Sequence, residues 1–251
     1  MTLISRAALL ITALLLAVPA SSQTRLYFPA TTAAAITPAA DANWNDASEI
    51  QRRQLANVKG SSAITAGQTV DILEDQADYQ DLDRQYISTR MASGVIFTSA
   101  STTVGAVVMM REFGATDDVT QCILGIRVLS EDGGTVRQTL LAVSNIGPTL
   151  EMINNATMRN KQCANLGVDT LTASYTTVTG DRLVVEIGYQ TDGAETTPQA
   201  AGKWGENATD CAENETNTSD CAGWIEFSNT ITFIGEAGPP VGGLLLLGVG
   251  R

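Results

Sequence analysis

The segment from Trp204 to Phe227, WGENATDCAENETNTSDCAGWIEF, gathers oxygen-bearing side chains around two cysteines. Oxygen ligands of this kind are those that calcium prefers. The spacing differs from that of an EF-hand, so two interpretations stay open: a calcium site, or a polar connection between strands that its charge keeps soluble. A second acidic run, Asp71 to Asp83, adds ligands only if the fold brings it near. The candidate calcium ligands are Asp210, Glu213, Glu215 and Asp220; no other cofactor is expected.

Four Asn-X-Ser/Thr triplets match the acceptor pattern for N-glycosylation. This pattern is typical of exposed loops in secreted chains, and it is used only where the source organism glycosylates. The candidate sites are Asn155, Asn207, Asn214 and Asn217.

Four cysteines and no histidine favour two disulfides over a metal site, because no Cys-X-X-Cys pair is present. Four cysteines allow three pairings. We favour Cys211 with Cys221, since a short separation closes at a low entropy cost, and this leaves Cys122 with Cys163.

The lack of histidine also excludes Ser-His-Asp and Cys-His nucleophiles and the usual zinc ligand sets. A carboxylate-only glycoside hydrolase needs just two of the 27 acidic residues, but none lies in an aromatic-rich setting that would grip a sugar. A net charge of −12 repels nucleic acid and anionic membranes at long range. The expectation is a protein that is not an enzyme.

Trp204 and Trp224 are the candidate ligand or surface residues. Trp204 opens the acidic segment as a candidate sugar platform. Trp224 alternates away from the apolar side chains of its strand, which is compatible with an outer sheet surface, a place under the Pro-rich arm or a contact with another chain. For both tryptophans, ordinary packing is the favoured interpretation.

Residues 1–22 have the layout of a secretory signal peptide: Arg6, an apolar run from Ala7 to Val18, Pro19 and small residues. The apolar run is short for a bilayer span. We therefore expect a secreted or cell-surface protein with no transmembrane span after signal removal.

Alternating apolar and polar residues predict strands in most of the remaining chain. The runs CILGIRVL and RQTLLAVS flank Asp132-Gly133, a hairpin dipeptide. GDRLVVEIGY places Leu183, Val185, Ile187 and Tyr189 inward, and WIEFSNTITF places Ile225, Phe227, Ile231 and Phe233 on one face. One or two helical turns are predicted over EIQRRQLA, capped by Ser48.

The spacing of these strands predicts an all-β chain, an antiparallel β-sandwich of the jelly-roll type. The predicted organisation is a signal segment at 1–22, an Ala/Thr/Pro-rich arm at 23–62, the sandwich at 63–234 and an apolar tail at 235–251. The four leucines of the tail are expected to dock on the body or on a neighbouring subunit.

The segments TRLYFP, IRVLSEDGGTVRQTLLAV, GDRLVVEIGY and WIEFSNTITF together resemble a group of poorly characterised all-β proteins from environmental bacterial and bacteriophage sequences. The resemblance covers most of Thr24 to Phe233 and implies a jelly-roll surface or virion component. We therefore expect an extracellular structural or adhesive component, with self-association or cell or virion surface components as partners. A carbohydrate-binding module with glycan partners is the first alternative, and a glycoside hydrolase the second.

Overall fold

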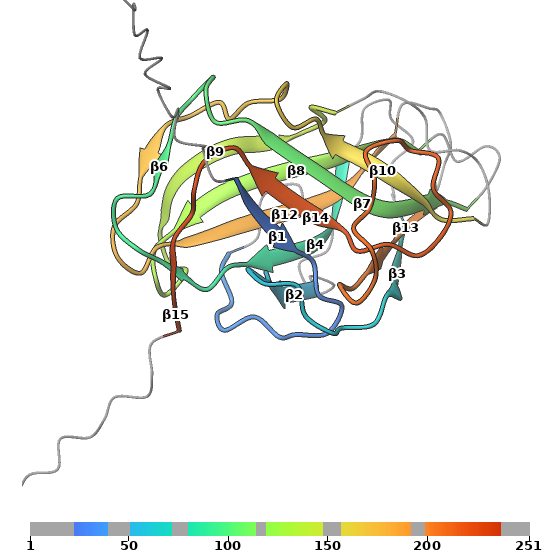
Figure 1. Ribbon diagram of the computed structural model, residues 1–251, viewed down its shortest axis with the longest axis horizontal. Coiled ribbons are helices and arrows are strands. Elements are labelled where there is room, and N and C mark those ends of the chain that lie inside the picture. Colours follow the sequence, from blue (N-terminus) through green and yellow to red (C-terminus); the bar gives the residue numbers. More distant parts are fainter. Residues whose placement is uncertain are drawn as a thin grey trace, which may run out of the picture.

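Two sheets packed face to face form the body of the protein, and Figure 1 shows the strands of one crossing over those of the other. The computed structural model describes residues 23–39, 51–71, 80–113, 119–147, 157–191 and 199–236. These residues form strands and irregular segments, and none of them is helical. The predicted all-β class is confirmed.

Eight strands make up the two principal sheets. The first contains β3 (Thr65–Asp71), β13 (Gln199–Trp204), β7 (Val104–Glu112) and β10 (Arg159–Ala164) in that spatial order. The second contains β4 (Gln80–Ile87), β12 (Arg182–Thr191), β8 (Val119–Leu129) and β9 (Val136–Ser144). If these eight strands are numbered 1 to 8 in chain order, from β3 to β13, their spatial order is 1-8-3-6 in the first sheet and 2-7-4-5 in the second. This is the strand order of a jelly roll. The predicted antiparallel sandwich of this type is confirmed.

The other strands extend these sheets or form small pairs. β14 (Trp224–Phe227) and β1 (Thr24–Tyr27) enlarge the first sheet, and β2 (Gln51–Gln54) adds to the second in parallel with β4. Two short pairs close one end: β5 (Arg90–Met91) with β15 (Phe233–Gly235), and β6 (Ile96–Phe97) with β11 (Tyr175–Thr176).

The core between the sheets follows the alternation in the sequence. Successive side chains of a strand point to opposite faces, so every second residue of β8 and β12 faces the opposite sheet. The predicted inward residues lie in one buried cluster: Cys122, Leu124, Ile126, Val128, Leu183, Val185, Ile187, Tyr189, Ile225, Phe227 and Ile231, with Phe233 packed against it. The predicted faces are confirmed.

The hairpin between β8 and β9 turns at Asp132-Gly133, as predicted. Gly133 has a φ of +75°, a conformation that side chains with a Cβ rarely adopt. Asp132 Oδ1 accepts hydrogen bonds from Ser130 Oγ at 2.6 Å and from the Gly134 N–H at 3.0 Å. The turn therefore contains its own hydrogen-bonding partners.

The predicted Ala/Thr/Pro-rich arm contributes to the core as well as lying over the body. Leu26, Phe28 and Leu55 lie in the main core cluster, and Ala34 and Ile36 pack on the outer face of the second sheet. The arm and the sandwich thus share one core.

Two predictions about elements were wrong. The helical turns expected over EIQRRQLA are replaced, within the described residues, by β2, because pairing with β4 supplies its backbone hydrogen bonds. The single strand expected from Ile225 to Phe233 is divided: β14 pairs with β7, whereas β15 pairs with β5.

The predicted signal segment lies outside the described residues, and so does the tail beyond Glu236. Within the described part of the chain, no helix has the length and apolar character to cross a membrane.

Candidate functional site

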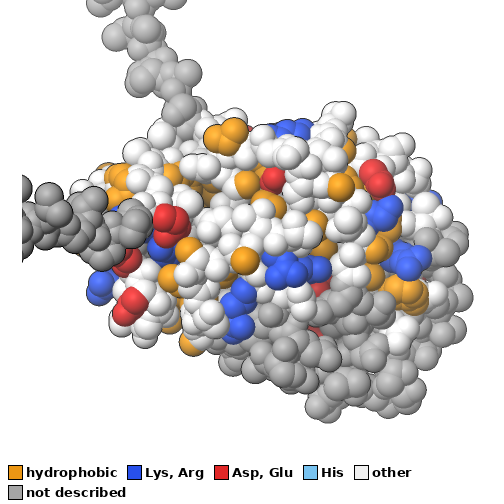
Figure 2. Space-filling model, turned by 90° about the horizontal axis from the view of Figure 1, so that it is seen from below, with side chains coloured by type: hydrophobic (Ala, Val, Ile, Leu, Met, Phe, Trp, Pro, Cys, Tyr) orange, Lys and Arg blue, Asp and Glu red, His pale blue; other side chains and the backbone are white. Residues whose placement is uncertain are grey.

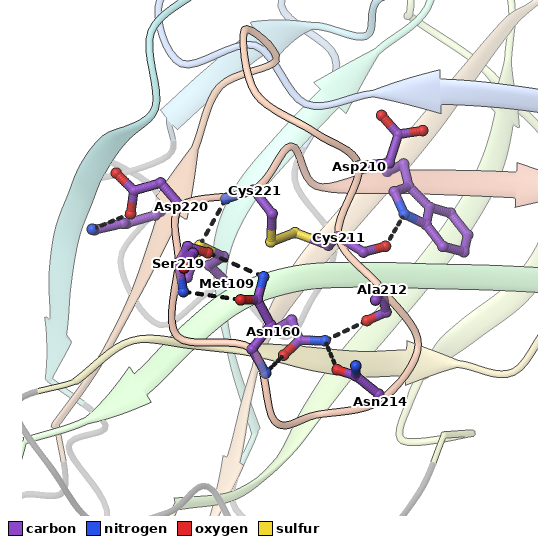
Figure 3. Close-up of a disulfide and its surroundings, with 12 residues drawn as sticks. Met109, Asn160, Asp210, Cys211, Ala212, Asn214, Ser219, Asp220 and Cys221 are labelled. Atoms are coloured by element: carbon purple, nitrogen blue, oxygen red, sulfur yellow. Dashed lines mark hydrogen bonds and ion pairs between the residues drawn. A yellow bond between two sulfur atoms is a disulfide. The ribbon is translucent and has the colours of Figure 1, made fainter.

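The acidic segment interrupts one continuous line of pairing along β7. Lys203 of β13 pairs with Met109, and Trp224 of β14 pairs with Val107, so only Val108 separates the two pairings on β7. Residues 205–223 therefore form an excursion between two strands, β13 and β14, that pair with the same edge of β7. We call these residues the strap, because they cross the outer face of the first sheet (Figure 3).

A disulfide closes the strap. Cys211 and Cys221 are bonded, with Cα atoms 4.8 Å apart, as predicted. Beneath this strap disulfide lies a cluster of buried apolar residues on the outer face of the first sheet, formed by Val107, Met109, Met158, Ala201 and Trp224. The Cys211 carbonyl accepts a 2.8 Å hydrogen bond from Trp224 Nε1. The strap is thus the cover of a second, smaller core.

The other predicted disulfide, Cys122 with Cys163, is also present. It joins β8 of the second sheet to β10 of the first, with both cysteines in the main core. We call it the inter-sheet disulfide. Because it connects the two layers directly, it opposes their separation.

The strap continues past the outer face to the free edge of β10. The Asn160 N–H donates to the Asn217 carbonyl at 3.1 Å, and the Asn217 N–H donates to Asn160 Oδ1 at 2.7 Å. Asn160 Nδ2 donates to Asn214 Oδ1 at 2.9 Å and also to the Ala212 carbonyl (Figure 3). The next free-edge group, the Gln162 N–H, donates to Glu215 Oε1 at 3.0 Å. An exposed edge strand invites pairing with another chain, and here the strap covers this one.

The four candidate calcium ligands do not converge. Asp210 lies 2.8 Å from Arg25 Nη1 and 2.5 Å from Lys59 Nζ, while Asp220 lies 2.6 Å from Lys203 Nζ. Glu215 lies 3.2 Å from the buried Lys161 Nζ, and Glu213 is exposed. Among the described residues no three acidic or cysteine side chains are grouped as a metal site. The carboxylates thus connect the strap to basic residues of the body.

These ion pairs alter the titration of Asp210. Burial alone would raise its pKa, but hydrogen bonds from Lys59 and Arg25 hold the pKa of the carboxyl below its ordinary value. Arg25 also donates from Nε to Glu226 and lies 4.0 Å above the Trp224 ring. One cation therefore connects the strap, the first sheet and the aromatic ring.

The second acidic run is described only at Asp71 and from residue 80 onward. Residues 72–79 lie outside the described residues, and Asp81 and Asp83 are buried in β4 of the second sheet. Tyr189 OH donates to Asp83 Oδ2 at 3.2 Å. This run therefore supplies no ligand to the strap from its described part.

Neither tryptophan is a surface platform: both are buried, in agreement with the favoured interpretation of ordinary packing, and the candidate ligand or surface role is not supported. Trp204 is buried in the main core, with its ring 6.2 Å from that of Phe28 and 5.7 Å from that of Tyr86. Trp224 does face outward from its sheet as predicted, but the strap covers it.

The glycosylation candidates differ in exposure. Asn207 is exposed, Asn214 accepts from Asn160, and Asn217 donates from Nδ2 to the Ser219 carbonyl at 3.2 Å. Asn155 lies outside the described residues. Of the three described sites, Asn207 presents the freest side-chain amide.

Sequence analysis missed the residues that hold the strap in place. Asn160, Lys161 and Arg25 come from β10 and β1, remote from the strap in the chain. The only sequence signal was a polar pair, Asn160-Lys161, inside a segment that now proves to be a strand.

No known protein family and no curated protein matches the chain in sequence. Among solved structures, the chain is similar to a CocE/NonD family hydrolase from Staphylococcus aureus, with 11% identity and a TM-score of 0.40 over 83% of this chain and 37% of the hydrolase. It is more weakly similar to the infectious bursal disease virus Gx strain structure, with 15% identity and a TM-score of 0.20 over 76% of this chain and 40% of that one. The structure of a VP2 subviral particle of that virus has 12% identity and a TM-score of 0.16, over 78% of this chain and 43% of the VP2 chain. The chain thus spans less than half the length of these structures.

Proposed function

We propose that this protein is a structural or adhesive component of an extracellular surface, and that it acts by assembling with other subunits and not by catalysis. The observation that supports the non-catalytic part of the proposal is that the polar side chains of the strap are used within the chain. They are directed to β10, Arg25, Lys59 and Lys203 of the same chain, and they seal an edge and a face of the sandwich.

The disulfides support the extracellular part of the proposal, because both are formed and such bonds persist in an oxidising exterior. Figure 2 shows basic and acidic side chains interspersed over the visible face, with hydrophobic side chains in small separate groups.

The first alternative loses its named candidates, because a carbohydrate-binding module needs exposed aromatic rings, and Trp204 and Trp224 are both buried. A glycoside hydrolase needs two carboxyl groups across a cleft. The sequence named no such pair, and the hollow described below is lined by no carboxylate.

The test is the mass of purified residues 23–251 in solution, measured by light scattering across a range of concentrations. We expect reversible self-association. A monomer at every concentration would overturn the proposal, and binding of that monomer to a panel of polysaccharides would favour a binding module instead.

A further inference from the structure

A hollow of about 520 Å³ lies at one end of the sandwich, between residues 92–96 and residues 229–232. Its two walls are bonded to each other: Asn229 Nδ2 donates to the Ile96 carbonyl, and the Ala92 N–H donates to the Thr232 carbonyl, both at 2.8 Å. None of the residues that line it is charged. The hollow is therefore a preformed, neutral feature of the surface.

Exposed apolar side chains lie on the elements around this hollow. Ile96 is 59% exposed, Val178 50% and Ile234 45%, which makes three of the seven exposed large hydrophobic residues of the described chain. Val178 follows Thr177, whose N–H donates to the Val95 carbonyl at 2.9 Å. Ile234 belongs to β15, which pairs with β5. The surroundings of the hollow therefore favour an apolar occupant.

The chain itself contains a segment of matching chemistry. Residues 237–251, AGPPVGGLLLLGVGR, have no charged side chain before Arg251, and Leu244 to Leu247 are four consecutive leucines. Burying a leucine side chain is worth about 1.5–3 kcal/mol. Such a segment suits a neutral hollow with an apolar rim.

The direction of the chain after the hollow indicates whether the tail fills the hollow of its own chain or that of a second copy. After Thr232, which bonds to Ala92 beside the hollow, the chain runs back along β5, with Phe233 opposite Met91 and Gly235 opposite Arg90. Each step along β15 thus leads away from the hollow of the same chain.

The exit point of the tail is fixed. Arg182 is buried and donates to both carboxylate oxygens of Glu236, at 2.8 and 2.6 Å. Its guanidinium also donates to the carbonyls of Glu131 and Ser88. The tail therefore starts from a fixed position, after a strand that runs away from the hollow of the same chain.

We propose that the hollow receives residues 237–251 of a second copy of this chain. The inference rests on the proposed function, because it assumes that the protein self-associates. Since the hollow and the exit point lie at the same end, two copies facing each other can exchange tails reciprocally. Such an exchange buries the same surfaces on both partners and closes as a two-fold dimer.

The experiment compares five forms of residues 23–251 by analytical ultracentrifugation: the unchanged chain, a deletion of residues 237–251, and the variants Ile96→Glu, Thr232→Lys and Val58→Glu. Val58 is the matched control, because it is 73% exposed and belongs to none of the elements around the hollow. Thr232→Lys, an exposed change in the hollow wall, is a second blocking variant. Thermal unfolding confirms that each variant is folded.

We expect a dimer from the unchanged chain and from Val58→Glu, a monomer from the deletion, and dimerisation at least about tenfold weaker in both blocking variants. Dimers that need the tail but tolerate both blocking variants would overturn this inference and leave the proposed function standing. Tail-dependent assemblies larger than two would overturn the reciprocal exchange.

Monomers in every form would instead refute the proposed function, and two further measurements then assign the tail. Slower hydrogen exchange of amides 92–96 in the tailed monomer would show that the chain fills its own hollow. Tail-dependent binding to phosphatidylcholine vesicles would assign the tail to a lipid surface. Either result overturns the proposed exchange.

Discussion

Replacing Asn160 with alanine should detach the strap from the edge of β10. The buried Asn160 side chain donates to Asn214 and Ala212 and accepts from the Asn217 N–H, so three hydrogen bonds are lost together. Each is worth about 0.5–1.5 kcal/mol net. Partners in the exposed part of the strap recover some of this by bonding to water, so we expect a loss of about 2–3 kcal/mol in the free energy of unfolding.

Asn207→Ala is the matched control, because it makes the same chemical change at an exposed position of the strap. It should change the free energy of unfolding by less than about 0.5 kcal/mol. Urea unfolding of the oxidised proteins gives both values, provided that the slope with urea concentration is unchanged.

Amide hydrogen exchange measures the detachment of the strap in Asn160→Ala independently of the free energy of unfolding. The Gln162 N–H donates to Glu215 of the strap, so its exchange should accelerate in Asn160→Ala and stay slow in Asn207→Ala. If the two variants unfold alike and Gln162 exchanges at the unchanged rate in both, the strap does not seal this edge and our reasoning fails.

Three further predictions concern the core, the disulfides and acid stability. Phe227→Ala should lower the free energy of unfolding by about 3–5 kcal/mol, because the ring is fully buried; a loss below about 1 kcal/mol in urea unfolding would mean that it faces outward. Replacing the inter-sheet disulfide by two alanines should cost about 4 kcal/mol and replacing the strap disulfide about 2.7 kcal/mol, since they span 41 and 10 residues; equal losses would contradict the loop-entropy argument. The pKa of Asp210 is held below its ordinary value of 3.8 in the folded state, so its pairing stabilises the protein near neutral pH and is lost as the pH falls through the folded pKa. Asp210→Asn should therefore show a shallower decline of unfolding free energy between about pH 5 and pH 2, and an unchanged decline would refute the pairing.

The inner faces of the strands could be predicted because they depend only on local alternation. Leu183, Val185 and Ile187 share a face in any pleated strand, whatever pairs with it. The hairpin at Asp132-Gly133 is local in the same sense, because its turn chemistry lies within a few residues. The jelly-roll order needed only the number of strands and their spacing.

The position of the strap could not be predicted, because it depends on pairing between remote segments. Trp224 was correctly placed on an outer face, but its cover follows from the separate pairing of β13 and β14 with β7. The partners of the acidic residues are equally remote in sequence: Asp210 meets Arg25, and Glu215 meets Lys161. A cluster of carboxylates in sequence carries no information about which cations will face it, so calcium and a solvated loop were the only visible alternatives.

β2 shows the same limit for secondary structure. Its sequence, QRRQ, has no alternation and follows a residue pattern that suits a helix cap. Pairing with β4 overrides this weak preference, and Arg52 Nε then donates to Gln85 Oε1 of that strand at 3.0 Å.

The distribution of charge explains why association at the hollow is compatible with a strongly acidic protein. Two copies that each carry −12 repel at long range, although salt screens this beyond about 8 Å at physiological ionic strength. At the end that contains the hollow, carboxylates are paired with cations of the same chain: Arg90 with Glu131, Arg137 with Asp181, and Arg182 with Glu236. The hollow adds no charge of its own. These three ion pairs lower the charge at this end, so that the burial of apolar side chains is opposed mainly by the distant, screened charge of the rest of each body.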